Sequence, residues 1–208
     1  MWNPQGRLWL VLGAGAWVVL VVAGMKLVLD HGSRSGAAAV APAVWPASSR
    51  LARDSHRGTL LLFAHPRCPC TRASLGELER IVARAHGRLA VTVVFAVPRG
   101  SDPIWARSDR WHEARTIPGV RLFVDSTGTE EGRFGVATSG QALFYDAGGR
   151  LRFAGGITVS RGHAGDNAGA DAVVALAEHD SASWQATPVY GCALDSPSKG
   201  AATSCPER

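Results

Sequence analysis

The chain has 208 residues, enough for one globular domain of ordinary size with appendages at its ends. Its formal net charge is +5, and all but two of its 22 basic residues are arginines. These arginines are scattered singly, without basic runs or interleaved aromatic residues. The charge therefore indicates a solvated surface and argues against a nucleic-acid-binding face.

An apolar segment opens the chain. Residues 8–29 carry one charge, Lys26 near the end, and as a helix they span roughly 33 Å, close to the thickness of a bilayer core. We expect a tail at 1–7 and a transmembrane anchor at 8–29. The alternative is a cleaved signal peptide, with Arg7 as its basic start and the small residues 37–39 for cleavage, but the apolar run exceeds the usual length. We expect the anchor to be retained, with the C-terminal part on the non-cytoplasmic (periplasmic) side.

Residues 30–57 are rich in Gly, Ser, Ala and Pro and show no apolar period. This composition predicts a flexible linker, in which Trp45 is exposed to solvent or to the membrane surface. The folded domain is expected at 58–195. A disordered tail, rich in Ser, Ala and Pro, is expected at 196–208.

Within the domain, short apolar runs alternate with amphipathic or capped segments. The patterns predict strands at 59–63, 89–97, 120–125, 141–145 and 151–154. They predict helices from the cysteine motif at 68–70 to about residue 87, at 109–116 and at 168–179, with a short helix or turn at 130–136. Residues 146–150 favour a hairpin turn between the last two strands. This order indicates an α/β domain with a mixed sheet.

Cys68 and Cys70 lie where the first strand ends and the first helix of the domain begins. The unpaired N–H groups and the dipole of a helix start stabilise negative charge, so a thiol there ionises more readily. Because the thiolate attacks disulfides and binds soft metals, the placement favours redox or metal chemistry over inert packing. Arg72 either stabilises that thiolate or is a solvated helix residue.

Three further segments accompany this junction at residues 64–74: Phe134–Gly140, Gly155–Asn167 and Pro188–Cys192. On these residues the chain resembles the thioredoxin-like superfamily, and more narrowly the membrane-anchored proteins called RedB. The resemblance covers positions 60–194. It implies a thioredoxin-like mixed sheet flanked by helices, a membrane anchor, and a redox motif at the first strand–helix junction.

The chain departs from the thioredoxin-like pattern at two places. One residue, and not two, separates Cys68 from Cys70, so either cysteine can occupy the nucleophile position. The position at which the family carries a cis-proline falls on Gly140. Glycine does not hold the cis bond that orients a substrate segment, which argues against general exchange with protein disulfides.

A second candidate cluster follows the predicted hairpin. Arg161, His163, Asp166 and Asn167 lie in a glycine-rich loop that this fold can bring near the redox end. His163 is a general base for a thiol, a metal ligand, or a structural loop residue. The sequence leaves three roles open for Cys192: resolving a mixed disulfide, completing a metal site, or pairing with Cys205.

These patterns predict a membrane-anchored thiol–disulfide oxidoreductase whose candidate catalytic residues are Cys68, Cys70, Arg72, His163 and Cys192. Its partners would be protein thiols or disulfides, or a membrane respiratory or assembly protein. No organic cofactor is implied, because the chain lacks a phosphate-cradling loop and a dinucleotide fingerprint. The alternative is a module that binds Cu(I) through His65, Cys68 and Cys70 and delivers it to a respiratory complex.

Overall fold

The computed structural model describes residues 4–37, 39–97 and 102–194. The chain divides into two compact units, one ending at Arg34 and the other beginning at Ser35. The first unit is helix α1 (Pro4–Ser33), whose side chains from Gly6 to Leu29 are all exposed. By length and composition, Gly6–Ser33 can cross a membrane as an anchor or act as a signal sequence.

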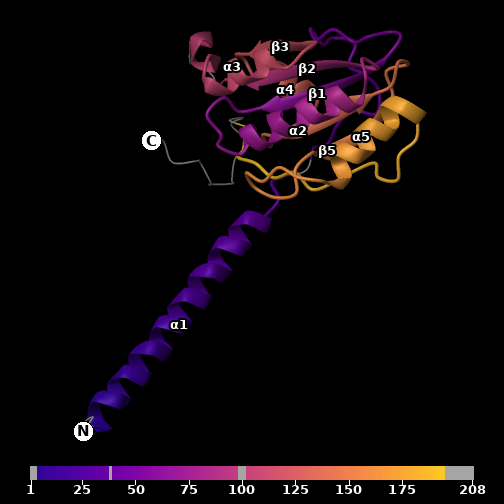
Figure 1. The fold of residues 1–208 in the computed structure, drawn as a ribbon. Helices are drawn as coiled ribbons and strands as arrows, with labels where there is room; N and C mark the ends of the chain where they lie inside the picture. The colour runs from indigo at the N-terminus through magenta and orange to yellow at the C-terminus, as the bar shows by residue number, and fades with distance from the viewer. Residues whose placement is uncertain (1–3, 38, 98–101, 195–208) are drawn as a thin grey trace. The chain divides into compact units, whose positions relative to one another are not determined.

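The second unit is built on a five-stranded mixed sheet with the strand order β3-β2-β1-β4-β5 (Figure 1). The strands are β1 (Gly58–Ala64), β2 (Leu89–Ala96), β3 (Val120–Asp125), β4 (Gln141–Tyr145) and β5 (Leu151–Gly156). β1, β2 and β3 run parallel, whereas β4 is antiparallel to both of its neighbours. The central strand β1 is buried from Thr59 to Ala64, which explains its unbroken apolar run.

Helices cover both faces of this sheet. They are α2 (Thr71–Arg84), α3 (Asp109–Thr116), α4 (Thr129–Arg133) and α5 (Ala168–His179), with a short 3₁₀ helix at Pro103–Ala106. Alternate residues of β1 enter two separate apolar clusters, because successive strand side chains point to opposite faces. Leu60 and Leu62 pack with residues of α2, α3 and α5. Leu61 and Phe63 pack on the other face, where Phe134 follows α4.

The fold class predicted from the sequence is confirmed, and four elements match to the residue. These are α3, β3, β4 and α5. The side chain of Asn167 accepts from the Ala170 N–H, so Asn167, and not Asp166, caps α5. Differences are small: β5 continues to Gly156, and the helix predicted at 130–136 covers only Thr129–Arg133.

The prediction of a flexible linker at 30–57 with an exposed Trp45 is corrected by the structure. α1 continues to Ser33, and the strap, defined as residues 35–37 and 39–57, lies against the domain. Its backbone bonds include Val40 N–H to Gly135 O (3.0 Å) and Trp45 N–H to Gly149 O (2.8 Å). The Trp45 ring packs edge-on against Phe134 and Tyr145, with distances between ring centroids of 5.1 and 5.2 Å. Backbone pairing and one aromatic anchor hold the strap, and neither leaves a periodic pattern in the sequence. The predicted tail at 196–208, with Cys205, lies outside the described residues.

Candidate functional site

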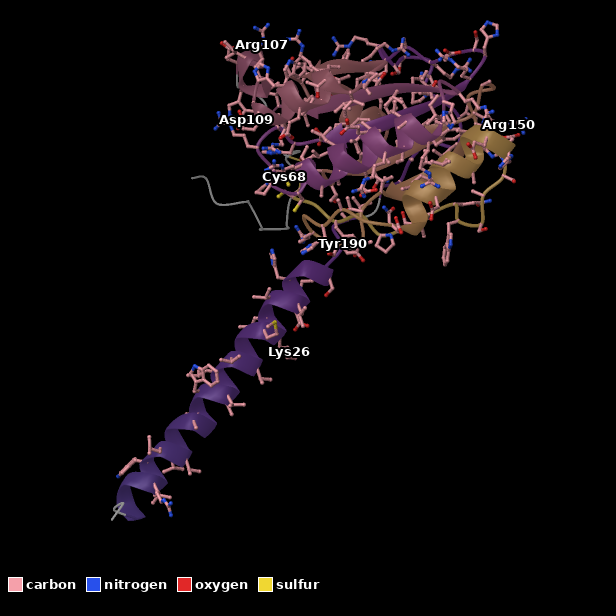
Figure 2. All side chains as sticks on the ribbon, in the orientation of Figure 1. Lys26, Cys68, Arg107, Asp109, Arg150 and Tyr190 are labelled. Atoms are coloured by element: carbon pink, nitrogen blue, oxygen red, sulfur yellow. The ribbon has the colours of Figure 1, made fainter. Side chains whose placement is uncertain are left out.

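The cysteine motif occupies the turn between β1 and α2, as the sequence predicts. Cys70 is the residue before the first turn of α2, and Cys68 lies two residues earlier. The turn is closed by Cys68 N–H to His65 O and by Thr71 N–H to Cys68 O, each 3.1 Å. Cys68 is 1% exposed, whereas Cys70 is half-buried. Figure 2 labels Cys68 at the end of α2 where that helix begins. Both are free thiols.

The surroundings of Cys68 favour its thiolate. The Cys70 thiol, acting as hydrogen-bond donor, is the largest cause that lowers the Cys68 pKa, from 9.0 to about 6, against the opposing effect of burial. The backbone N–H groups of Cys192, Cys70 and Thr71 also point to this sulfur and lower its pKa further. A sulfur with this pKa is mostly thiolate at neutral pH, and the thiolate is the form of cysteine that acts as a nucleophile.

The pKa of Cys70 is shifted in the opposite direction to that of Cys68. Its hydrogen bond to the Cys68 sulfur raises the Cys70 pKa far above its ordinary value, and burial and the Cys68 charge add to the rise. The Arg161 charge and the Gly162 N–H oppose this shift. The glycine-rich loop after β5 therefore reaches the cysteine motif, as the sequence analysis anticipated for this fold.

Cys192 reaches the same place from the far end of the domain. Its Sγ lies 2.7 Å from the Sγ of Cys68, 124 positions away in the chain. Cys192 is 8% exposed and is disulfide-bonded. Three sulfurs, Cys68, Cys70 and Cys192, therefore gather at the β1–α2 junction, two of them as thiols.

The hydroxyl groups of Thr71 and Ser139 form hydrogen bonds that hold this turn. The His65 N–H donates to Ser139 Oγ at 2.9 Å, and Thr71 Oγ1 donates to His65 O at 3.0 Å. The hydroxyls of Thr71 and Ser139 are 3.1 Å apart and both residues are buried. The sequence analysis did not single out Ser139; the only signal was its place in the segment 134–140.

Gly140 follows Ser139 and begins the approach to β4. Its N–H donates to Phe63 O at 2.8 Å, and its φ of +90° is a conformation that favours glycine. A Cβ at this position would lie 3.0 Å from Ser74 Oγ on α2. The position at which the resemblance implies a cis-proline is therefore close to the first turn of α2, and every peptide bond in the described part of the chain is trans.

Arg72 and His163 are exposed, unlike the buried Cys68. The Arg72 side chain is 76% exposed, and its Nε is 3.8 Å from a Glu113 carboxylate oxygen. His163 is exposed, with Nδ1 2.8 Å from the Arg161 carbonyl oxygen of its own loop. The cation that acts on the cysteines is therefore Arg161, which the sequence analysis placed in the loop cluster without this role.

Glu77 of α2 holds the loop. This carboxylate is buried and accepts from the Gly165 N–H at 2.7 Å and from Asn167 Nδ2 at 3.5 Å. Arg80 neutralises it at 2.9 Å. One helix thus carries both the cysteine motif at its start and the tether that positions Arg161 and Gly162 beside it.

The residues of the copper alternative are not arranged as a ligand set. No group of three or more His, Cys, Asp or Glu residues that could hold a metal ion occurs in residues 4–37, 39–97 and 102–194. His65 Nδ1 accepts from the Arg67 N–H at 3.3 Å, and its ring packs edge-on against Trp105. We therefore derive no step through copper.

No protein-family model and no curated protein matches the chain. Among the solved structures that resemble the fold are two proteins described as hypothetical or uncharacterized. The hypothetical protein SMc02350 from Sinorhizobium meliloti 1021 is 22% identical, with a TM-score of 0.56, over 77% of this chain and 93% of that one. An uncharacterized conserved protein from Geobacillus kaustophilus is 17% identical, with a TM-score of 0.58, over 79% and 94%. A more distant match is the exposed lipoprotein thioredoxin Etrx1 from Streptococcus pneumoniae, with 20% identity, coverage of 60% and 85%, and a TM-score of 0.44. At these identities the likeness is one of fold.

Proposed function

We propose that this protein is a membrane-anchored thiol–disulfide oxidoreductase with Cys68 as its nucleophile and protein thiols or disulfides as its substrates. The observation that carries the proposal is the setting of the Cys68 sulfur. It is buried in the turn that begins α2, 2.7 Å from the Cys192 sulfur, where hydrogen bonding from the Cys70 thiol and from nearby backbone N–H groups lowers its pKa to about 6. Such a setting stabilises the thiolate before any substrate arrives.

The chemistry follows from that thiolate. Cys68 attacks one sulfur of a substrate disulfide, a new S–S bond forms, and the other substrate sulfur leaves as a thiolate. A second protein thiol then attacks the Cys68 sulfur and releases the remaining substrate thiolate. Two electrons pass from the protein dithiol to the substrate disulfide, and the reverse sequence oxidises a substrate dithiol.

The test is a redox titration of the full chain in detergent micelles. The protein is equilibrated in glutathione buffers, quenched with acid and alkylated, and its thiols are counted by mass spectrometry. We expect a reversible two-electron transition of the Cys68 thiol, located by peptide mapping, and we expect that transition to be absent from Cys68→Ser. Thiols that never pair at any glutathione ratio, or a transition unchanged in Cys68→Ser, would overturn the proposal.

We further propose that α1 is retained as the anchor and that the domain is non-cytoplasmic. The support is an uninterrupted helix from Pro4 to Ser33 whose side chains from Gly6 to Leu29 find no partner surface in the described structure. Intact-mass measurement of protein extracted from membranes tests retention: a species lacking the N-terminal segment would identify a cleaved signal sequence. Labelling of whole cells with a membrane-impermeant maleimide tests the side.

A further inference from the structure

The C-terminal segment Gly191–Leu194 is fastened to the loop that precedes β4. Ser139 N–H donates to Cys192 O at 2.8 Å, and Leu194 N–H donates to Ala137 O at 2.8 Å. Thr138 and Ala193 form an antiparallel bridge between these bonds. The approach at Gly191 is so close that a Cβ there would overlap the Ser139 carbonyl oxygen. Cys192 is therefore held in place by backbone bonds on both sides.

This fastening places the Cys192 sulfur against Cys68 and not against Cys70. The two sulfurs are 2.7 Å apart, and the Cys192 N–H also points to the Cys68 sulfur. A free thiol at Cys68 faces a disulfide-bonded sulfur at Cys192. Thiol–disulfide exchange requires such a pair, with direct access between the attacking sulfur and the sulfur attacked.

Cys70 is poorly suited to close a disulfide with Cys68. Its thiol donates a hydrogen bond to Cys68 and stays protonated, and a protonated thiol is a weak nucleophile. Only Pro69 separates the two cysteines, so a bond between them would close a small ring at the start of a helix. Disulfide geometry is specific, and departures from it store strain.

We propose that Cys192, and not Cys70, is the sulfur with which Cys68 exchanges, and that Cys70 is a positioning thiol that supports the attacking sulfur. This inference rests on the proposed function and names its resolving residue. In the reduced chain Cys68 first forms a mixed disulfide with a substrate sulfur. The Cys192 thiolate then attacks the Cys68 sulfur, a Cys68–Cys192 bond forms, and the bond from Cys68 to the substrate sulfur breaks. The substrate sulfur leaves as a thiolate. One disulfide replaces another, so the step consumes no outside oxidant or reductant.

The sequence makes the three sulfurs separable by trypsin. Cleavage after Arg67 and Arg72 leaves Cys68 and Cys70 together in peptide 68–72. Cys192 falls in peptide 162–199, and Cys205 falls in peptide 200–208. A Cys68–Cys192 bond therefore joins the first two peptides, whereas a Cys68–Cys70 bond stays within peptide 68–72.

The experiment maps these bonds in the full chain. Fully reduced protein in detergent micelles is oxidised in a glutathione buffer, quenched with acid, alkylated, digested and analysed by mass spectrometry. We expect the cross-link between peptides 68–72 and 162–199, retained in Cys70→Ser and lost in Cys192→Ser. In Cys192→Ser we also expect a glutathione adduct to accumulate on Cys68, because no thiol is left in place to release it.

The wild-type map decides the matter even if a variant folds poorly. A bond confined to peptide 68–72, or a map in which Cys68 and Cys192 are not joined at any glutathione ratio, would overturn the role of Cys192. In both cases a two-electron transition that depends on Cys68 would leave the proposed function standing. A chain with no Cys68-dependent transition would overturn both proposals.

Discussion

The side-chain hydroxyls of Thr71 and Ser139 lie 3.1 Å apart, although the two residues are 68 positions apart in the chain. Thr71 is the first residue of α2, and Ser139 comes two residues before β4. Through His65 they also hold the turn that carries Cys68. The geometry of the thiolate site therefore depends on a contact between the start of α2 and the loop before β4, which are distant in sequence.

Removing either hydroxyl should destabilise the domain. Ser139→Ala leaves the His65 N–H without its acceptor and should cost about 1–3 kcal/mol. Thr71→Val removes one of two donors to the His65 carbonyl, since the Cys68 N–H remains, and should cost about 0.5–1.5 kcal/mol. Urea unfolding measures both, and the double variant should be less destabilised than the sum because the residues touch. Thr116→Val removes a hydroxyl-to-carbonyl bond from an exposed helix end and serves as control. A Ser139→Ala variant as stable as that control would contradict the brace.

The alkylation rate of Cys68 should depend on pH with a midpoint near its pKa of about 6. Below the midpoint the thiol is protonated and reacts slowly, and above it the rate reaches a plateau. Cys70→Ala should move the midpoint upward, because the S–H donor that favours the thiolate is gone. Cys70→Ser keeps a hydroxyl donor and should shift the midpoint less. Iodoacetamide labelling followed by peptide mapping measures these rates. Equal midpoints in the wild-type protein and Cys70→Ala would show that Cys70 does not tune the nucleophile.

Gly140 should not tolerate a side chain. Gly140→Ala combines an unfavourable φ of +90° with a Cβ 3.0 Å from Ser74 Oγ, and we expect a loss of about 1–3 kcal/mol. Gly76→Ala is the matched control, because this helical glycine has no atom within 4 Å of an added Cβ. The control should stabilise the domain by roughly 0.5–1 kcal/mol. Thermal unfolding of the two variants should therefore move in opposite directions, and a shift of the same sign would refute the assignment.

Glu77→Ala should release the loop that carries Arg161 and Gly162. The buried carboxylate accepts from the Gly165 N–H and from Asn167, and hydrogen bonds to a charged group contribute about 1.5–3 kcal/mol each. Hydrogen–deuterium exchange should speed up across residues 161–167, with a loss of global stability. Glu79→Ala, on the exposed side of the same helix, should leave the loop amides unchanged. Unaltered exchange in Glu77→Ala would mean that other contacts hold the loop.

The sequence by itself determined the elements. The unbroken apolar runs of β1 and β2 predict strands buried on both faces, and turn-forming Gly and Pro residues mark their ends. The capping residues at 166–167 and the helix predicted after them match α5 to the residue, although only the structure shows that Asn167 is the cap. The place of Cys68 and Cys70 at a helix start, and hence thiolate chemistry, also follows from local order alone.

Only the tertiary structure decided which residues surround the sulfur. From the sequence, Arg72 either stabilises the thiolate or is a solvated helix residue. In the structure its side chain is exposed near Glu113, whereas the charge of Arg161 lowers the pKa of Cys70. The strap looked unstructured because backbone pairing with a remote segment leaves no periodic signal. Cys192 meets Cys68 because a bridge at Thr138 and Ala193 brings the chain end back to the sheet. The propensity to form a helix or strand depends on neighbouring residues, whereas such contacts depend on how the whole sheet assembles.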